Sequence, residues 1–360
     1  MNTIALTAPD DAVRLTAAPG GAATLPLLVT PGRAGTAAAL AEWMARHADW
    51  VQAQLRSHGA LMFRGFGVEN ADDFETIARA VAPKLNNEYL GTSPRDAVKP
   101  GGYVFSASEL PGHYPIPEHC EMTFTREPPQ RIFFSCLIQP AEGSGETPLV
   151  DFRKVWRDLD PAVRERFASR RIRIIRNYSG PDDAGRDLFQ LKRWDEMFQT
   201  RDKDEVERVA RREGFQPVWK SHDRLALVSE HDAMRPHPET GEPVWFNHSQ
   251  VFHLSAAPGE FKRIARLRPT PRHIGLWLFS SLLVAWKKLR YRAEDQAMHV
   301  TWADGSEIAT ADMEAVRDAI WKHLAVVSWK RGDVVAIDNN STGHGRLPYQ
   351  GPRQVVVCWA

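Results

Sequence analysis

Apolar and polar positions along the chain follow two different periods, one typical of helices and one typical of strands. Apolar residues at helical spacing predict helices over residues 38–55, 72–82, 156–167, 203–212 and 310–324. Short apolar runs bounded by turn residues predict strands over residues 60–63, 118–124, 131–137, 147–150, 172–177, 243–246, 326–329, 333–338 and 354–359. This mixture of helices and strands predicts an α+β protein.

Two stretches of the chain carry little regular pattern. The first 35 residues are rich in Ala, Gly, Thr and Pro, and we expect a loose N-terminal leader there. Residues 86–104 are loop-like, and long loops in compact domains are usually lids or binding loops.

His119, Glu121 and His344 are candidate metal ligands. In an extended strand, positions i and i+2 point to the same face, about 7 Å apart at their α-carbons, so His119 and Glu121 can reach one ion while Cys120 faces away. His344 follows an apolar strand in a turn-rich segment. Two histidines and one carboxylate form the facial triad of non-haem Fe(II), and the same set also suits zinc. Without further support, a histidine beside a solvated glutamate is the simpler interpretation.

Several segments around these residues resemble one enzyme family. They are GALMFRGF (residues 59–66), GSGETPLVD (143–151), VWFN (244–247) and NNSTGHGRLPYQGPR (339–353). In order and spacing they are similar to the 2-oxoglutarate-dependent oxygenases related to taurine dioxygenase, from about residue 55 to the C-terminus. The branch of syringomycin-type amino-acid hydroxylases is the most similar, because it has His-x-Glu where taurine dioxygenase has His-x-Asp.

The resemblance implies a double-stranded β-helix (a cupin-like jelly roll) with flanking helices, and a site for Fe(II), 2-oxoglutarate and dioxygen. His119, Glu121 and His344 are then the iron ligands. Arg353, nine residues beyond His344, matches the family arginine that binds the far carboxylate of 2-oxoglutarate. A guanidinium suits this role because it is a planar two-point donor. Thr147 matches the threonine that assists it.

Other polar residues of the motifs are expected to have lesser roles. Arg346 is interpreted as a brace of the loop that carries His344 or of a nearby carboxylate, and Asp338 as a residue that orients the same loop. For His248, near the VWFN segment, an ordinary loop histidine is the simpler interpretation and a residue facing the substrate is the alternative. Asn86, Arg95 and Asn247 are the candidates for substrate binding.

The expected reaction is oxidation of a C–H bond, most simply hydroxylation, in a small amino-acid-like or carrier-tethered substrate of specialised metabolism. Desaturation and ring closure are alternatives on the same site. Glu121 argues against a halogenase, which would need a small residue there to make space for halide. A zinc hydrolase and a non-catalytic cupin-like binding protein are the alternatives from other classes, and neither needs 2-oxoglutarate at Arg353.

The two halves of the expected site lie far apart in sequence, which favours a single domain over residues 36–360. A basic, helical insert is expected at about residues 256–297. Its most apolar run, residues 274–286, contains Ser280 and Ser281 and is shorter than the roughly twenty residues that a membrane-spanning helix needs. We expect it to pack over or beside the barrel mouth; a mobile lid and a subunit contact are the alternatives.

Charge and cysteine content limit the partners. A net charge of +1 gives no field suited to nucleic acid or to a membrane, so neither is expected as a partner. Three scattered cysteines predict no disulfide framework and favour the cytoplasm. The N-terminal residues lack the basic and apolar pattern of a signal peptide. A homo-oligomer is left open.

Overall fold

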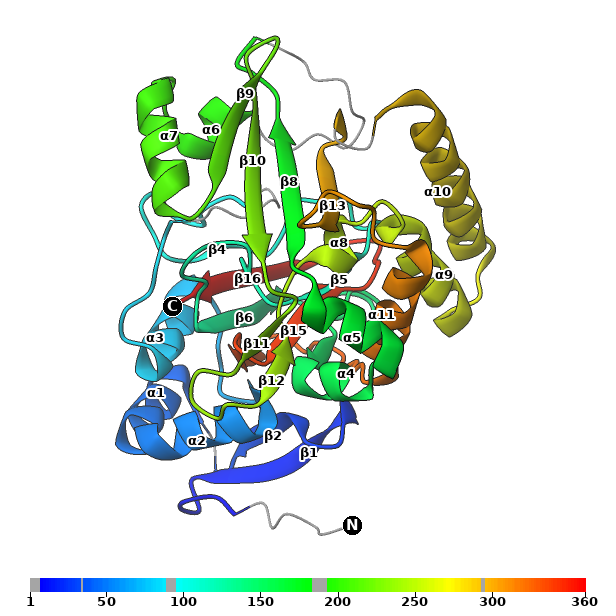
Figure 1. Ribbon diagram of the computed structural model, residues 1–360. Coiled ribbons are helices and arrows are strands. Elements are labelled where there is room, and N and C mark those ends of the chain that lie inside the picture. Colours follow the sequence, from blue (N-terminus) through cyan, green and yellow to red (C-terminus); the bar gives the residue numbers. More distant parts are fainter. Residues whose placement is uncertain (1–6, 34, 89–94, 183–192, 293–294) are drawn as a thin grey trace.

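The structure is a computed structural model that describes residues 7–33, 35–88, 95–182, 193–292 and 295–360. Its main layer is a seven-stranded sheet in the order β1-β2-β3-β14-β6-β16-β4. Figure 1 labels β1, β2, β6, β16 and β4 of this sheet. Neighbouring strands are antiparallel except β2 and β3, which are parallel. The strands are β1 (Val13–Ala22), β2 (Leu25–Pro31), β3 (Ala60–Phe63), β4 (Phe105–Ser106), β6 (Arg131–Ile138), β14 (Val334–Asp338) and β16 (Gln354–Trp359).

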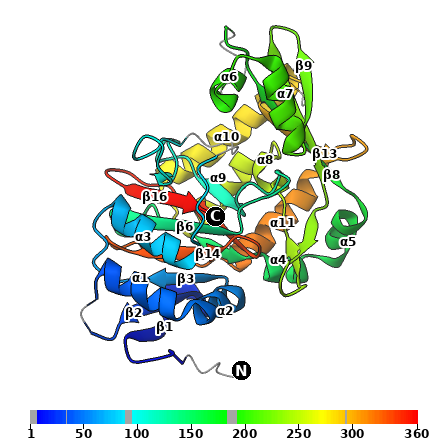
Figure 2. The ribbon, with the colours of Figure 1, turned by 90° about the vertical axis from the view of Figure 1, so that its left-hand side faces the viewer.

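Both faces of the central strands of this sheet are buried, because their successive side chains enter different cores. Phe133 and Val356 pack with the N-terminal helices, whereas Phe134 and Val357 join the larger core around the site. Figure 2 shows α1 and α3 in front of the sheet. The helices of this layer are α1 (Ala37–Arg46), α2 (Ala48–His58) and α3 (Ala71–Val81).

Three smaller sheets contain the other described strands. A three-stranded sheet, β5-β15-β7, carries the candidate ligands, and a four-stranded sheet, β13-β8-β10-β9, extends away from the main layer (Figure 1). A two-stranded sheet joins β11 to β12. The bounds are β5 (Ile116–His119), β7 (Leu149–Asp151), β8 (Ile172–Tyr178), β9 (Gln216–Lys220), β10 (Arg224–His231), β11 (Met234–Pro236), β12 (Pro243–Trp245), β13 (Met298–Trp302) and β15 (Thr342–Arg346).

The predicted insert forms two helices, α9 and α10. Helix α10 lies at the edge of the molecule and packs mainly on α9 (Figure 1). That this segment packs over or beside the mouth of the barrel remains a prediction. Within the described ranges, no helix is both long and apolar enough to cross a bilayer. The remaining helices are α4 (Phe152–Asp158), α5 (Pro161–Ser169), α6 (Trp194–Phe198), α7 (Lys203–Arg212), α8 (Ser249–Phe252), α9 (Ala256–Leu267), α10 (Pro271–Arg290) and α11 (Thr310–Lys322).

The structure differs from the sequence expectations at the N-terminus. The segment expected as a loose leader contains β1 and β2. Strand β2 is almost wholly buried and pairs with β3, so it completes the main sheet. Its residues Leu27 and Val29 enter the core formed with the N-terminal helices. Long-range pairing therefore orders a segment whose composition alone suggests disorder.

Other predicted elements are divided or shortened. The helix expected over 38–55 is two helices that meet at His47, and the helix over 156–167 is broken before Pro161, whose ring cannot continue a helix. The strand expected over 118–124 ends at His119. Residues 326–329 form no strand, because only an isolated bridge at Ala325 pairs this stretch. Predictions for β3 and α7 are confirmed.

Candidate active site

The structure brings His119, Glu121 and His344 together. His119 is the last residue of β5 and His344 lies in the middle of β15, where the two residues face each other in antiparallel register. Their ring centroids are 4.7 Å apart. One ligand atom from each of the three residues lies within 4.8 Å of the others, and all three residues are buried. This compact set of donors fits a single divalent metal ion.

Glu121 reaches this cluster from a turn and not from a strand. Met122, the next residue, has a positive φ of 52°, which is strained for a side chain of its size. The Glu121 amide donates to Oδ1 of Asn339 at 2.7 Å, and Nδ2 of Asn339 donates to the carbonyls of Glu121 at 3.1 Å and Pro129 at 2.7 Å. Asn339 thus fixes the backbone of the carboxylate ligand from both sides.

The two histidines are arranged to present a lone pair. The Nδ1 atom of His119 donates to the Pro117 carbonyl at 2.8 Å, which leaves Nε2 to face the cluster. Burial, followed by the closeness of His344, which would repel a second protonated imidazole, lowers the pKa of His119 to about 4. Burial also lowers the pKa of His344. Both imidazoles are therefore neutral at neutral pH, as metal ligands must be.

Arg95 reaches the same cluster from the long loop. Its guanidinium donates to Oε2 of Glu121 at 2.5 Å, and its side chain is 4% exposed. Burial by itself raises the pKa of Glu121, but the charge of Arg95 and the nearby imidazole of His344 outweigh it and hold the pKa below its ordinary value. The carboxylate is therefore ionised. Arg95 also lies over the ring of Trp359, with its guanidinium carbon 5.7 Å from the ring centroid.

Arg353 and Thr147 form a second group of candidate residues. Arg353 donates through Nε to the Gly145 carbonyl at 2.8 Å and through an Nη atom to Oγ1 of Thr147 at 3.3 Å. Burial, followed by the charge of Arg346, lowers the pKa of Arg353 to about 10. Among the described residues, no carboxylate forms an ion pair with Arg353. A desolvated guanidinium of this kind fits an anionic ligand.

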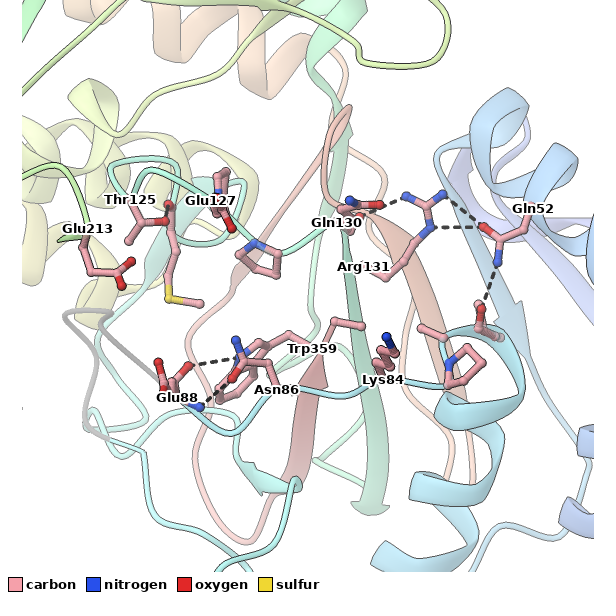
Figure 3. Close-up of a pocket in the computed structure, with 17 residues that line it drawn as sticks. Gln52, Lys84, Asn86, Glu88, Thr125, Glu127, Gln130, Arg131, Glu213 and Trp359 are labelled. Carbon is pink, nitrogen blue, oxygen red and sulfur yellow. Dashed lines mark hydrogen bonds between the residues drawn. The ribbon is translucent and has the colours of Figure 1, made fainter. Parts of the chain in front are cut away.

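Two of the proposed substrate residues lie outside the ligand cluster. Asn247 is buried, donates to the Ala233 carbonyl at 2.7 Å and accepts from the amide of Ser249 at 2.9 Å, which is a structural role. Asn86 pairs its backbone amide with the carbonyl of Trp359 and lines a cavity of about 640 Å³ beside the C-terminal strand (Figure 3).

The remaining motif residues support the loops of the site. Arg346 donates to the carbonyls of residues 110, 111 and 114, so it holds the segment that precedes β5 and not the loop that was predicted. Asp338 accepts from Arg131 at 2.9 Å and shares a hydrogen bond of 2.8 Å with His237, which orients the turn that precedes His344.

Sequence reasoning missed two neighbours of the ligands. One is Asn339, although it lies within the quoted motif. The other is His248, whose ring centroid is 5.0 Å from that of His119 and which shares a 2.6 Å hydrogen bond with Thr123. Neither has a spacing in the sequence that relates it to residues 119–121.

We expect Asn339→Ala to weaken metal binding and stability together. The substitution leaves the amide of Glu121 and two carbonyls without partners in a buried place, which costs on the order of 3 kcal/mol. Supporting residues of this type typically change metal affinity by about 10- to 100-fold. Anaerobic titration with a divalent metal and thermal unfolding measure the two effects.

Asn70→Ala is the matched control. Asn70 caps α3 by accepting from the amides of Asp72 and Asp73, far from the ligands in sequence. Its loss costs about 1 kcal/mol of stability and leaves metal affinity unchanged. Equal metal affinity in Asn339→Ala and the parent protein would disprove the positioning role of Asn339.

Comparison with known proteins identifies the family. Residues 26–359 match the model of the taurine catabolism dioxygenase TauD, TfdA family. The dapdiamide synthesis protein DdaC of Enterobacter agglomerans is 29% identical over 304 residues, covering 84% of this chain and 82% of that protein. A clavaminate synthase-like protein of Arabidopsis thaliana is 27% identical over 312 residues, covering 86% of this chain and 83% of that protein.

Solved structures show the same fold. PvcB from Pseudomonas aeruginosa has a TM-score of 0.55 at 14% identity, covering 100% of this chain and 94% of that one. A taurine dioxygenase from Burkholderia xenovorans has a TM-score of 0.52 at 13% identity, covering 97% and 89%. The family match spans nearly the whole chain and includes the three clustered ligands. The chain therefore belongs to the TauD, TfdA family of iron- and 2-oxoglutarate-dependent oxygenases.

Proposed function

We propose that this oxygenase hydroxylates a C–H bond of a small amino-acid-like acid. His119, Glu121 and His344 would hold Fe(II), and the observation that carries this assignment is the approach of their ligand atoms within 4.8 Å. When bound, iron couples the oxidative decarboxylation of 2-oxoglutarate by dioxygen to oxidation of the substrate. The three-stranded sheet that carries His119 and His344 and the main sheet would form the two sides of the expected double-stranded β-helix.

Arg353 would bind the far carboxylate of 2-oxoglutarate, with Thr147 beside it. The support is a guanidinium that is desolvated, held by the Gly145 carbonyl, and without a carboxylate partner among the described residues. Trp329 donates to Oγ1 of Thr147 at 3.2 Å, which fixes this hydroxyl near the arginine. These contacts agree with a pocket built for an anion.

Arg95 would bind the carboxylate of the substrate. Its guanidinium reaches a metal ligand directly, so a substrate held by Arg95 has its neighbouring carbon atoms close to the metal. An aminoacyl group tethered to a carrier by a thioester has no free carboxylate, and Arg95 therefore favours a free acid. The name of one relative, a dapdiamide synthesis protein, agrees with a role in specialised biosynthesis.

Three free, buried cysteines agree with the reducing cytoplasm as the location.

The experiment that tests this function is a substrate panel. Purified protein with Fe(II) and 2-oxoglutarate is incubated with free amino acids, related small acids and carrier-tethered aminoacyl groups, and succinate release is measured. Hydroxylation adds one oxygen to the product, whereas desaturation and ring closure remove two hydrogens. Release of succinate only with tethered substrates would contradict the role of Arg95. No succinate release with any substrate would leave the proposed function without support.

We expect Arg95→Ala to raise the KM for the substrate identified in this panel. Loss of a buried charge partner typically costs about 2–5 kcal/mol, which corresponds to about 30- to several thousand-fold. The KM for 2-oxoglutarate stays near the parent value. Fe(II) affinity does not fall, because removing a cation beside Glu121 favours a second cation there. An unchanged KM for the substrate would mean that a residue other than Arg95 binds the substrate carboxylate.

A further inference from the structure

Helix α10 has an apolar face that is exposed to solvent. Every exposed position from residue 274 to residue 286 is apolar or glycine. The exposed fractions of its large side chains are 42% for Ile274, 53% for Leu278, 63% for Phe279, 71% for Leu282, 45% for Trp286 and 91% for Leu289. We call these six residues the α10 apolar face. Apolar patches of this kind on soluble proteins mark sites of interaction.

The inner side of α10 is largely apolar, although Ser280 and Lys287 are also buried there. Leu276, Leu283 and Val284 line an apolar cavity of about 180 Å³ between α10 and the body of the protein. Figure 1 shows the helix at the edge of the molecule, beside α9. A helix with apolar residues around most of its circumference is ordinarily buried on most of its surface. The outer side of α10 therefore needs a partner that the described chain does not supply.

Within residues 261–293, which include α10, the charged side chains all have one sign. Exposed basic residues flank it at both ends: Arg266 and Arg272 near its start, and Lys288 and Arg290 near its end. The sequence contains no Asp or Glu from residue 261 to residue 293, although the whole chain has a net charge of only +1. Positive charge is thus concentrated around the apolar face, and it complements an anionic surface.

Two kinds of partner can cover an exposed apolar helix of this length, and their charge distinguishes between them. A second copy in a two-fold contact presents the same patch, so its arginines and lysines approach those of the first copy. An anionic phospholipid surface offers apolar chains to the α10 apolar face and phosphates to its basic ends. Trp286 lies near the basic end, and tryptophan is enriched at membrane interfaces.

We propose that α10 is a membrane-surface contact, with the helix lying in the plane of an anionic bilayer and not crossing it. Twenty residues make a helix about 30 Å long, which places the whole apolar face on the lipid at once. This differs from the expectation of no membrane partner, which rested on net charge and on the length of the apolar run. It is independent of the proposed reaction.

Vesicle binding tests the proposal without any turnover. The full-length protein is sedimented with vesicles of phosphatidylcholine, alone or with about one third phosphatidylglycerol. We expect binding to the anionic vesicles, weakened by added salt. The double substitution F279S/L282S removes apolar area, and K288E/R290E reverses two charges. Each is expected to reduce binding by about tenfold or more.

Val218→Ser is the matched control, because Val218 is an exposed apolar residue (39%) on β9. It should bind vesicles like the parent protein. Light scattering coupled to size-exclusion chromatography tests the alternative, in which a second copy of the chain covers the α10 apolar face. A dimer that F279S/L282S dissociates, without vesicle binding, would overturn the proposal in favour of a subunit contact. A monomer that binds no vesicles, or equal binding to neutral and anionic vesicles, would also overturn it.

Discussion

His119→Ala, Glu121→Ala and His344→Ala are each expected to abolish turnover while the protein remains folded. Each substitution removes one of three donors whose ligand atoms lie within 4.8 Å of one another, so the remaining pair cannot complete a facial triad. The Glu121 variant also leaves Arg95 without its carboxylate partner in a buried place, and cation binding there becomes electrostatically unfavourable. Loss of Fe(II) binding in anaerobic titration should accompany loss of succinate release.

Cys120→Ala is the control for this series. Cys120 lies between two of the ligands and is buried, but it belongs to the large apolar core and not to the ligand cluster. Replacing this small side chain should cost stability alone and leave Fe(II) affinity close to that of the parent. Full turnover in any of the three alanine variants would remove that residue from the ligand set. Loss of Fe(II) binding in Cys120→Ala would mean that the three alanine variants lose Fe(II) through general disruption of the fold and not through loss of a ligand.

The sequence was sufficient to predict the three candidate ligands that gather at the site, but not the local structure that places each of them. The i and i+2 argument for His119 and Glu121 assumed a strand that continues to residue 124. The strand ends at His119, and a turn with a positive φ at Met122 delivers Glu121 instead. Glycine or asparagine usually marks such a conformation, and methionine gives no signal of it.

The groups that hold the ligands were also beyond the reach of sequence pattern. Asn339 and Glu121 are separated by 218 positions, and no period relates them. Arg95 was predicted as a substrate residue, but its contact with Glu121 depends on how the long loop folds back. Local periodicity describes neighbours within a helix or a strand, whereas these contacts are made by loops that the sheets bring together.

The N-terminal strands show the same limit for the fold. Residues 1–35 are poor in helix and strand signals, so composition favoured a loose leader. Strand β2 is ordered because β3 offers a free edge for pairing and because Leu27 and Val29 fill the core beneath the N-terminal helices. Predictions held where a segment's own pattern decides its structure, as in α7, and failed where distant partners decide it.

The requirement for 2-oxoglutarate should rise steeply in Arg353→Ala. If Arg353 binds the far carboxylate, its removal costs about 2–5 kcal/mol, or about 30- to several thousand-fold in 2-oxoglutarate affinity. Arg353→Lys keeps the charge but loses the planar two-point contact, so it should recover only part of the affinity. Fe(II) binding should be nearly unchanged, because Arg353 is not among the clustered ligands. Anaerobic titrations of Fe(II) and then of 2-oxoglutarate measure the two affinities separately.

Arg331→Ala is the matched control for this prediction, because Arg331 is an exposed arginine that precedes β14. It should titrate with 2-oxoglutarate like the parent protein. In a zinc hydrolase, none of these substitutions would change 2-oxoglutarate affinity, because such an enzyme does not use 2-oxoglutarate. If Arg353→Ala binds 2-oxoglutarate as tightly as the parent, the anchor must be sought in another buried guanidinium near the ligands. Arg95, which already contacts Glu121, is then the first residue to test, because one arginine cannot hold both the co-substrate and the substrate.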